Sequence, residues 1–222
     1  MNAIWALVPV KAPAHAKSRL AGALDAAERA ALAAALARDS LGALAAARGL
    51  AGIALLGDAT TDSLAAAHGC TVVPEDPALD MSANLAAAAL RLGGMGADAV
   101  VIVPADLPLV TAAAVEALLA ALGPGVTVVP AADGGTNALG LVPPSDGPCC
   151  FGVDSARRHL EAARARGLAA RRVELAAFAR DVDTVDDVRW LCAQEAPSQA
   201  RDYLLASGIC ARLAQQDQRR RA

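Results

Sequence analysis

Short apolar runs alternate with longer stretches of helical periodicity along the whole chain. The apolar runs are bounded by Gly, Pro, Asn and Asp, which is typical of buried strands. Strands are predicted at residues 4–10, 52–57, 70–73, 99–103, 125–130, 137–142 and 170–175. Helices are predicted at 25–47, 62–68, 80–92, 112–122, 155–166 and 184–192. This alternation predicts an α/β fold built on a mostly parallel sheet.

The run from Ala99 to Val103 is the best candidate for a central strand. Nothing polar interrupts it, so both of its faces are predicted to be buried. It stops at Pro104, and Asp106 follows two residues later. Ligands of parallel sheets gather beyond the carboxyl ends of the strands, which makes Asp106 a candidate functional residue. The alternative is a cap for the next helix, but Thr111 is better placed for that role.

Composition is consistent with one ordinary α/β domain over residues 1–222, with a core at about 4–195 and C-terminal helices and a basic tail at 197–222. The chain is 55% hydrophobic and 2% aromatic, and its net charge of -3 gives no general attraction to nucleic acid. No basic leader precedes the first strand, and no apolar run reaches the ~18 residues that span a bilayer. The expected location is cytoplasmic, without membrane contact.

The five cysteines are odd in number and show no C-x-x-C spacing. Neither a disulfide framework nor a zinc site is therefore predicted. Cys149 and Cys150 are expected to be small apolar fillers.

A basic loop carrying Lys11, Lys17 and Arg19 follows the first strand. It matches neither G-x-G-x-x-G nor G-x-x-x-x-G-K-[ST], which weakens the dehydrogenase and P-loop interpretations. Its cations could instead hold a triphosphate by charge. The alternative is a solvated basic turn.

Asn84 lies in the first turn of a mainly apolar helix. Its amide could hydrogen-bond a base or a ribose, and the alternative is an exposed amide.

Two later segments could bind an anion. The turn at 131–136 is rich in turn residues and could close a hairpin, which leaves Thr136 at the mouth of a strand, where a hydroxyl can bind an oxyanion or make turn hydrogen bonds. Gly152 permits close backbone approach at the start of a helix, where Ser155 could bind an anion or act as a cap. Asp154 opposes an anion unless its side chain points away.

Asp183 completes the set of candidate chemical residues. In an extended segment Asp181 and Asp183 share one face. Thr184 and Asp187 resemble a capping box, but Asp183 has no such structural explanation and could face Asp106 across a metal. Carboxylates with phosphate oxygens are the usual ligands of Mg²⁺, which predicts metal-assisted phosphoryl chemistry.

A nucleophile-and-base pair is not evident, because His15, His68 and His159 are isolated along the chain and are expected at the surface. None is required if the attacking group is a phosphate, since its second pKa lies near ~6. Catalysis then reduces to alignment and charge neutralisation.

Five segments in order, VPVKAPAHAKSRLAG, VPADLPL, GTNALGL, CFGVDSARRHLEAARARG and RDVDTVDDV, resemble the 2-phospho-L-lactate or phosphoenolpyruvate guanylyltransferase family. The match runs from Trp5 to about Leu191. That family is related to molybdenum-cofactor guanylyltransferase. The resemblance implies a three-layer, Rossmann-like nucleotidyltransferase fold. The implied reaction joins GMP from GTP to a small phosphorylated carboxylic acid, releases pyrophosphate, and feeds the synthesis of coenzyme F420.

The resemblance also assigns roles to residues, with Mg²⁺ as the expected cofactor. The metal ligands are Asp106 and Asp183, the residues that hold the acid are Thr136, Gly152 and Ser155, and those on the nucleotide-phosphate loop are Lys11, Lys17 and Arg19. Lys17 and Arg19 are further predicted to be catalytic, and Asn84 to bind the nucleotide.

Two departures leave the acceptor open. The family often has Gly-Leu-Asn where this chain has Ser82-Ala83-Asn84, and Val153-Asp154 carries more charge than expected. Phosphoenolpyruvate, 2-phospho-L-lactate and 3-phosphoglycerate all remain candidate acceptors. A homodimer and a hand-off of the product to a downstream F420-pathway transferase are compatible with this interpretation.

Two other interpretations compete with it. The first is a related nucleotidyltransferase that acts on a pterin or a sugar phosphate. The second is a non-catalytic nucleotide-binding domain that has kept the fold.

Overall fold

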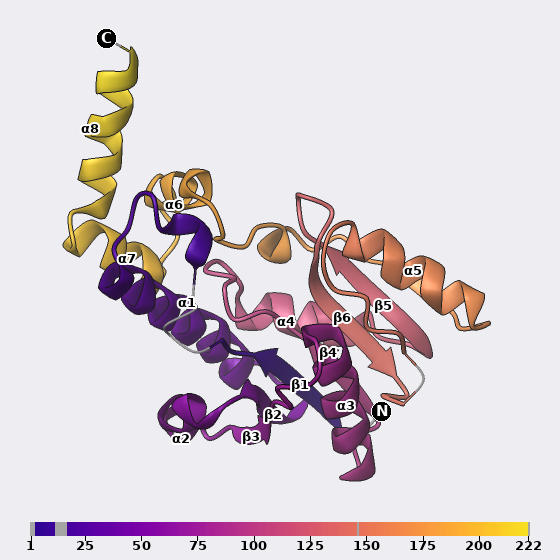
Figure 1. Ribbon diagram of the computed structural model, residues 1–222. Helices are drawn as coiled ribbons and strands as arrows, with labels where there is room; N and C mark the ends of the chain where they lie inside the picture. The colour runs from indigo at the N-terminus through magenta and orange to yellow at the C-terminus, as the bar shows by residue number, and fades with distance from the viewer. Residues whose placement is uncertain (1–2, 12–16, 146, 222) are drawn as a thin grey trace.

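The computed structural model describes residues 3–11, 17–145 and 147–221, which fold around a seven-stranded sheet (Figure 1). The strands are β1 (Ile4–Pro9), β2 (Leu50–Gly57), β3 (Thr71–Pro74), β4 (Ala99–Ile102), β5 (Gly125–Pro130), β6 (Thr136–Val142) and β7 (Ala170–Arg172). Their order is β3-β2-β1-β4-β6-β5-β7. β6 runs antiparallel to β4 and β5, whereas the other neighbouring pairs are parallel. The predicted, mostly parallel sheet is confirmed.

Helices cover both faces of this sheet. The α-helices of the described chain are α1 (Ala26–Ala46), α2 (Asp62–His68), α3 (Met81–Gly94), α4 (Ala112–Ala120), α5 (Ser155–Ala165), α6 (Val185–Cys192), α7 (Gln199–Ala206) and α8 (Ile209–Arg221). α1 and α4 pack on one face, and α3 and α5 pack on the other. The predicted three-layer arrangement is confirmed.

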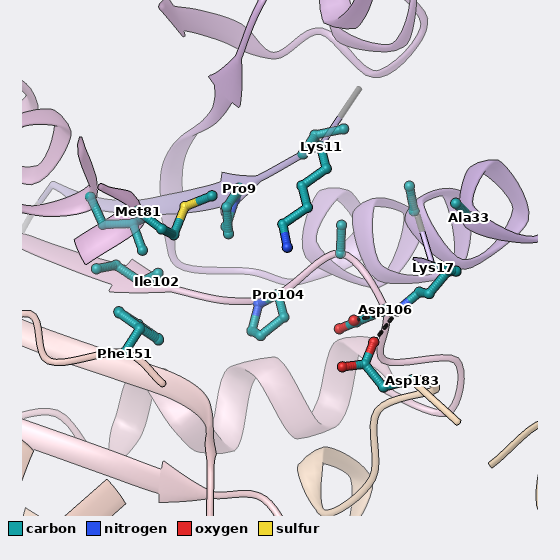
Figure 2. A pocket seen from close by; sticks show the side chains of 14 residues that line it. Pro9, Lys11, Lys17, Ala33, Met81, Ile102, Pro104, Asp106, Phe151 and Asp183 are labelled. Carbon is teal, nitrogen blue, oxygen red and sulfur yellow. Dashed lines mark hydrogen bonds and ion pairs between the residues drawn. The ribbon is translucent and has the colours of Figure 1, made fainter. Parts of the chain in front are cut away.

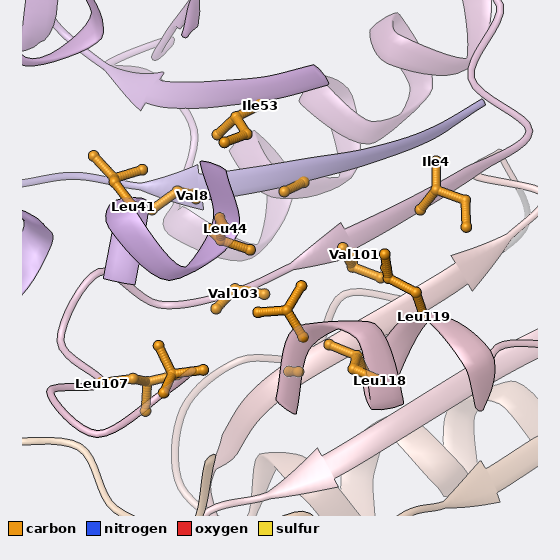
Figure 3. Close-up of a cluster of buried hydrophobic side chains, with 14 of the residues drawn as sticks. Ile4, Val8, Leu41, Leu44, Ile53, Val101, Val103, Leu107, Leu118 and Leu119 are labelled. Carbon is orange, nitrogen blue, oxygen red and sulfur yellow. The ribbon is translucent and has the colours of Figure 1, made fainter. Parts of the chain in front are cut away.

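β4 is the central strand that the apolar run predicted, and its side chains alternate between the two cores. Val101 packs with Leu44 of α1 and Leu118 of α4 in the cluster shown in Figure 3. Ile102 packs on the opposite face, in the cluster that contains Leu85 of α3. Every residue of β4 is fully buried. A charged residue just beyond this strand is therefore held by a rigid element.

Side-chain caps hold the starts of several helices, and the caps predicted at Thr111 and Thr184 are among them. Asp25 and Glu28 form a capping box at the start of α1, and Thr184 and Asp187 form another at the start of α6. The Ala114 backbone N–H donates to Thr111 Oγ1 at 3.2 Å, so Thr111 caps α4. Asp106 is therefore not needed as the cap of that helix.

The C-terminal helices add a third apolar cluster against the side of α1. It joins Leu32 and Leu36 of α1 to α6, α7 and α8 through Leu191, Leu204 and Leu213. Beyond Leu213, α8 projects away from the rest of the chain (Figure 1). The basic tail is part of this helix, which continues to Arg221, since Gln and Arg are good helix formers.

A disulfide between Cys192 and Cys210 joins the end of α6 to α8, so the expectation of no disulfide was wrong. The two residues are 18 positions apart, and the α6–α7–α8 turn brings their Cα atoms to 5.8 Å. No spacing motif records such a pair, because a tertiary contact creates it. No helix in the described part of the chain is long and apolar enough to cross a membrane.

Asp39 of α1 holds the start of α7, and this contact is testable. Its carboxylate accepts hydrogen bonds from Ser198 Oγ at 2.8 Å and from the Gln199 and Ala200 backbone N–H groups at 2.8 and 3.0 Å. We expect Asp39→Ala to lower the free energy of unfolding by about 1–3 kcal/mol, because it leaves these donors without their acceptor. Denaturant unfolding measures the change. Arg38→Ala, at the exposed neighbouring position, is the control, and equal losses in the two variants would contradict the assignment.

Candidate active site

Two segments distant in sequence meet beyond the carboxyl end of β4. The Val182 backbone N–H donates to the Asp106 carbonyl oxygen at 3.3 Å, which joins the segment before α6 to the segment after β4. The Asp183 backbone N–H donates to Asp187 Oδ2 at 3.2 Å, and this carboxylate is also part of the capping box of α6. The cap of α6 thus also fixes the position of Asp183, next to Asp106.

A third carboxylate lies beside the two that the sequence singled out. One ligand atom from each of Asp106, Asp181 and Asp183 falls within 4.8 Å of the others. Burial, followed by the charge of Asp106, raises the pKa of Asp181 to about 6. Sequence reasoning placed Asp181 on the same face as Asp183 but gave it no role. The alternation of side chains was the signal that could have found it.

Lys17 brings a positive charge between these carboxylates (Figure 2). Its Nζ donates to Asp106 Oδ2 at 2.6 Å and to Asp183 Oδ1 at 2.8 Å, and its side chain is only 9% exposed. Burial acts to lower the pKa of Lys17, but the two carboxylates outweigh it and hold the pKa above its usual value. Lys17 has a φ of 53°, a left-handed conformation that few non-glycine residues adopt.

Arg19 lies at the margin of this group. Its guanidinium is 3.8 Å from Asp183 Oδ2, and its side chain is 72% exposed. It can therefore reach solvent and a bound anion at the same time.

A cavity of about 250 Å³ opens beside the ion pairs. Pro9, Lys11, Met81, Pro104 and Phe151 contribute to its lining, together with Lys17, Asp106 and Asp183. Figure 2 shows the Lys11 side chain pointing into this space, on the side away from Lys17. The predicted basic loop therefore presents two lysines to one cavity. Residues 12–16, between them, lie outside the described residues.

The carboxylate group fits a divalent cation. Asp106 Oδ1 is buried and has no hydrogen-bond partner among the residues that the structure describes. A carboxylate oxygen in that state is stabilised by a positive ligand, and hard cations such as Mg²⁺ prefer carboxylate oxygens. Asp106, Asp181 and Asp183 can supply such ligands from one side of the cavity.

Thr136 and Ser155 form a second group, where β6 begins and α5 begins. Their hydroxyl oxygens are 2.9 Å apart, and Thr136 Oγ1 lies 3.1 Å from Nδ1 of His159. His159 was expected at the surface, and that expectation was wrong, because its ring is fully buried. It lies one helical turn after Ser155 on α5, so both side chains face the sheet.

Phe151 connects the two groups. Its ring lines the cavity beside Asp106 and also packs edge-on against the His159 ring, with ring centroids 4.8 Å apart. Gly152 follows with a φ of 121°, which favours glycine. Asp154 is 60% exposed and pairs with Arg157 at 3.9 Å. Its charge is thus directed outward, as an anion at the start of α5 requires.

Asn84 is neither exposed nor part of the cavity lining. It is 7% exposed, its Nδ2 donates to the carbonyl oxygens of Asp76, Leu79 and Asp80, and its Oδ1 accepts from the Asp76 backbone N–H. In this structure Asn84 fixes the turn that precedes α3. Its predicted role in nucleotide binding stays a prediction.

Two curated relatives are similar to this chain over most of their length. A phosphoenolpyruvate guanylyltransferase from Roseiflexus castenholzii is 40% identical over 210 residues, covering 92% of this chain and 97% of the relative. A 2-phospho-L-lactate guanylyltransferase from Methanothermobacter thermautotrophicus is 33% identical over 202 residues, covering 90% and 88%.

Solved structures support the fold. The crystal structure of a candidate nucleotide-diphospho-sugar transferase from Desulfovibrio desulfuricans G20 superposes with a TM-score of 0.79 at 23% identity, covering 96% of this chain and 99% of that one. The model of the family described as "Guanylyl transferase CofC like" matches residues 4–222. Because that match spans nearly the whole chain, including both candidate groups, the chain belongs to the CofC-like guanylyl transferase family.

Proposed function

We propose that this chain transfers GMP from GTP to a small phosphorylated carboxylic acid and releases pyrophosphate. The observation that carries the proposal is the cluster of Lys17, Asp106 and Asp183 beside the cavity. Guanylyltransferases at 33% and 40% identity support the choice of reaction. By the same resemblance, the product enters the synthesis of coenzyme F420.

In the proposed reaction, an oxygen of the acceptor phosphate forms a bond to the α-phosphorus of GTP. The bond from that phosphorus to the oxygen that bridges to the β-phosphate breaks, and pyrophosphate leaves with the electron pair. Lys11, Lys17 and Arg19 bind the triphosphate and balance its charge. The acceptor phosphate is already largely ionised at neutral pH, so no side chain has to remove a proton from it.

Asp106 and Asp183 would hold Mg²⁺, with Asp181 as a further carboxylate at the same place. When bound, a divalent cation neutralises phosphate charge and orients the reacting groups. Lys17 already neutralises these carboxylates in the ligand-free protein, which keeps the segments that carry them together.

Thr136, Gly152 and Ser155 would hold the acid. Hydroxyl and backbone N–H donors at the start of a helix suit a phosphate or carboxylate oxygen. The charge of Asp154 is turned toward Arg157, which leaves this helix start open to an anion.

The reaction is tested by pyrophosphate release from the purified protein with GTP and Mg²⁺. Phosphoenolpyruvate, 2-phospho-L-lactate and 3-phosphoglycerate are offered separately. We expect release with one of these acids and not when ATP replaces GTP. If GTP binds but no pyrophosphate is released with any of the three acids, the proposed acceptor class is contradicted. That result would favour first the pterin or sugar-phosphate alternative, then the non-catalytic one.

Replacement of the carboxylates tests the metal assignment. We expect Asp106→Asn and Asp183→Asn each to reduce turnover by orders of magnitude and to weaken Mg²⁺ binding measured by calorimetry, because each removes a charged ligand. Asp186→Asn is the matched control. It removes a carboxylate that is 83% exposed, three positions beyond Asp183. A folded Asp106→Asn or Asp183→Asn variant with a near-normal rate would exclude that residue from the mechanism.

Removal of one hydroxyl tests the acceptor subsite. We expect Thr136→Val to raise the acceptor KM about ten- to hundredfold, since a hydrogen bond to a charged group contributes about 1.5–3 kcal/mol, with little change in the GTP KM. Thr127→Val is the control. The Thr127 hydroxyl is fully buried on β5 and has no partner in the described part of the chain. A larger effect of Thr136→Val on the GTP KM would place Thr136 on the nucleotide side.

A further inference from the structure

His159 lies at the end of a chain of hydrogen bonds that leads to the proposed acceptor subsite. The Cys150 backbone N–H donates to Nε2 of the ring at 2.8 Å. On the other side of the ring, Nδ1 lies 3.1 Å from Thr136 Oγ1, which lies 2.9 Å from Ser155 Oγ. His159 is 0% exposed and Ser155 is 1% exposed. These partners are protein atoms, so the direction of each hydrogen bond can be worked out.

The first bond fixes the tautomer of the ring. A backbone N–H can only donate, so Nε2 must be the unprotonated nitrogen. A neutral imidazole carries one N–H, which is then on Nδ1. Burial lowers the pKa of His159 to about 4, with a smaller opposing effect from a hydrogen bond to the Ser155 backbone, so the ring is neutral at neutral pH. Nδ1 therefore cannot accept the Thr136 proton, and its N–H is shared between Thr136 Oγ1 and the Ser155 backbone carbonyl.

Counting hydroxyl protons shows what this direction achieves. Thr136 and Ser155 have one hydroxyl proton each, and the bond between their oxygens uses one of them. Because the protonated Nδ1 cannot accept a proton from the pair, the other hydroxyl proton is free to be donated to a ligand. With the opposite tautomer, the Thr136 proton would go to Nδ1 and the Ser155 proton to Thr136, so neither would remain. Phosphate and carboxylate oxygens are acceptors, and they need that free proton.

We propose that His159 is a positioning residue that, through its Nδ1–H, keeps one hydroxyl proton of the Thr136–Ser155 pair available to an anionic oxygen of the acceptor acid. This assignment rests on the proposed function, because it concerns the acceptor side of that reaction. The ring also packs against Phe151, which is one of the residues that line the cavity with Asp106 and Asp183. His159 thus contacts both the anion-binding hydroxyls and the cavity wall without touching the reacting atoms.

A purely structural His159 would do no more than satisfy the Cys150 N–H and fill space. That role predicts a loss of stability on substitution and equal effects on both substrates. The positioning role predicts a fixed tautomer and a selective effect on the acceptor.

The tautomer is measured on the ligand-free wild-type protein by ¹⁵N–¹H NMR of the histidine rings. The His159 signal is identified as the one missing from the His159→Asn variant. We expect a protonated Nδ1 and an unprotonated Nε2 at neutral pH. A proton on Nε2, or a doubly protonated ring, would overturn the assignment whatever reaction the protein performs.

Two variants test the effect on the acceptor. Asn can place an N–H near the position of Nδ1, whereas Leu fills similar space without a donor. We expect His159→Leu to raise the acceptor KM about tenfold, with kcat and the GTP KM within about twofold, and His159→Asn to restore most of the loss. Thr127→Val again serves as the control. A fall in melting temperature without a selective rise in the acceptor KM, or equal effects of Leu and Asn, would contradict the positioning role.

Binding of phosphoenolpyruvate, 2-phospho-L-lactate and 3-phosphoglycerate, measured by calorimetry without turnover, separates this inference from the proposed function. If the wild type binds one of these acids and His159→Leu binds it about tenfold more weakly, the inference holds even when no pyrophosphate is released. In that case, absence of pyrophosphate release contradicts the proposed guanylyl transfer but not the positioning role of His159. If the wild type binds none of the acids, the inference fails, because no acceptor anion is then bound to receive the hydroxyl proton.

Discussion

The ion pair that Lys17 makes with Asp106 and Asp183 is the interaction on which the site depends. Lys17 lies in the loop after β1, Asp106 in the loop after β4 and Asp183 in the segment before α6. The two contacts thus span 89 and 166 positions of the chain. Half-buried carboxylates this close repel one another, and a cation between them offsets that repulsion. The ammonium group thus holds three separate loops in one arrangement while the protein is free of ligand.

Much of this framework could be predicted from local pattern. The apolar run before Pro104 predicted a strand buried on both faces, and every residue of β4 is fully buried. Thr111 and Thr184 cap the helices that they were predicted to cap, and this left Asp106 and Asp183 as carboxylates without a structural explanation. Both lie beside the cavity: Asp106 follows the carboxyl end of β4, and the hydrogen bond from the Val182 backbone N–H to the Asp106 carbonyl oxygen holds Asp183 next to it.

The remaining features depend on contacts between elements, and local pattern records no such contact. His159 shares the apolar face of α5 with Ala156 and Leu160, a helical spacing that could have indicated its burial, but its hydrogen-bond partners come from outside that helix. Burial, followed by the charge of Asp106, which is far away in sequence, raises the pKa of Asp181. The Cys192–Cys210 disulfide likewise exists because α6 and α8 meet. The Asn84 amide was predicted to be free to bind a ligand, but it hydrogen-bonds the backbone of the turn before its own helix.

α1 belongs to two apolar cores at once. Leu41 and Leu44 pack into the cluster on the sheet, while Leu32 and Leu36 pack into the cluster formed with the C-terminal helices. Those helices cannot separate without exposing one side of the helix that also covers the sheet. The sheet and the C-terminal helices are therefore coupled in unfolding, and the molecule should lose its structure in one cooperative transition rather than shed its C-terminal part first.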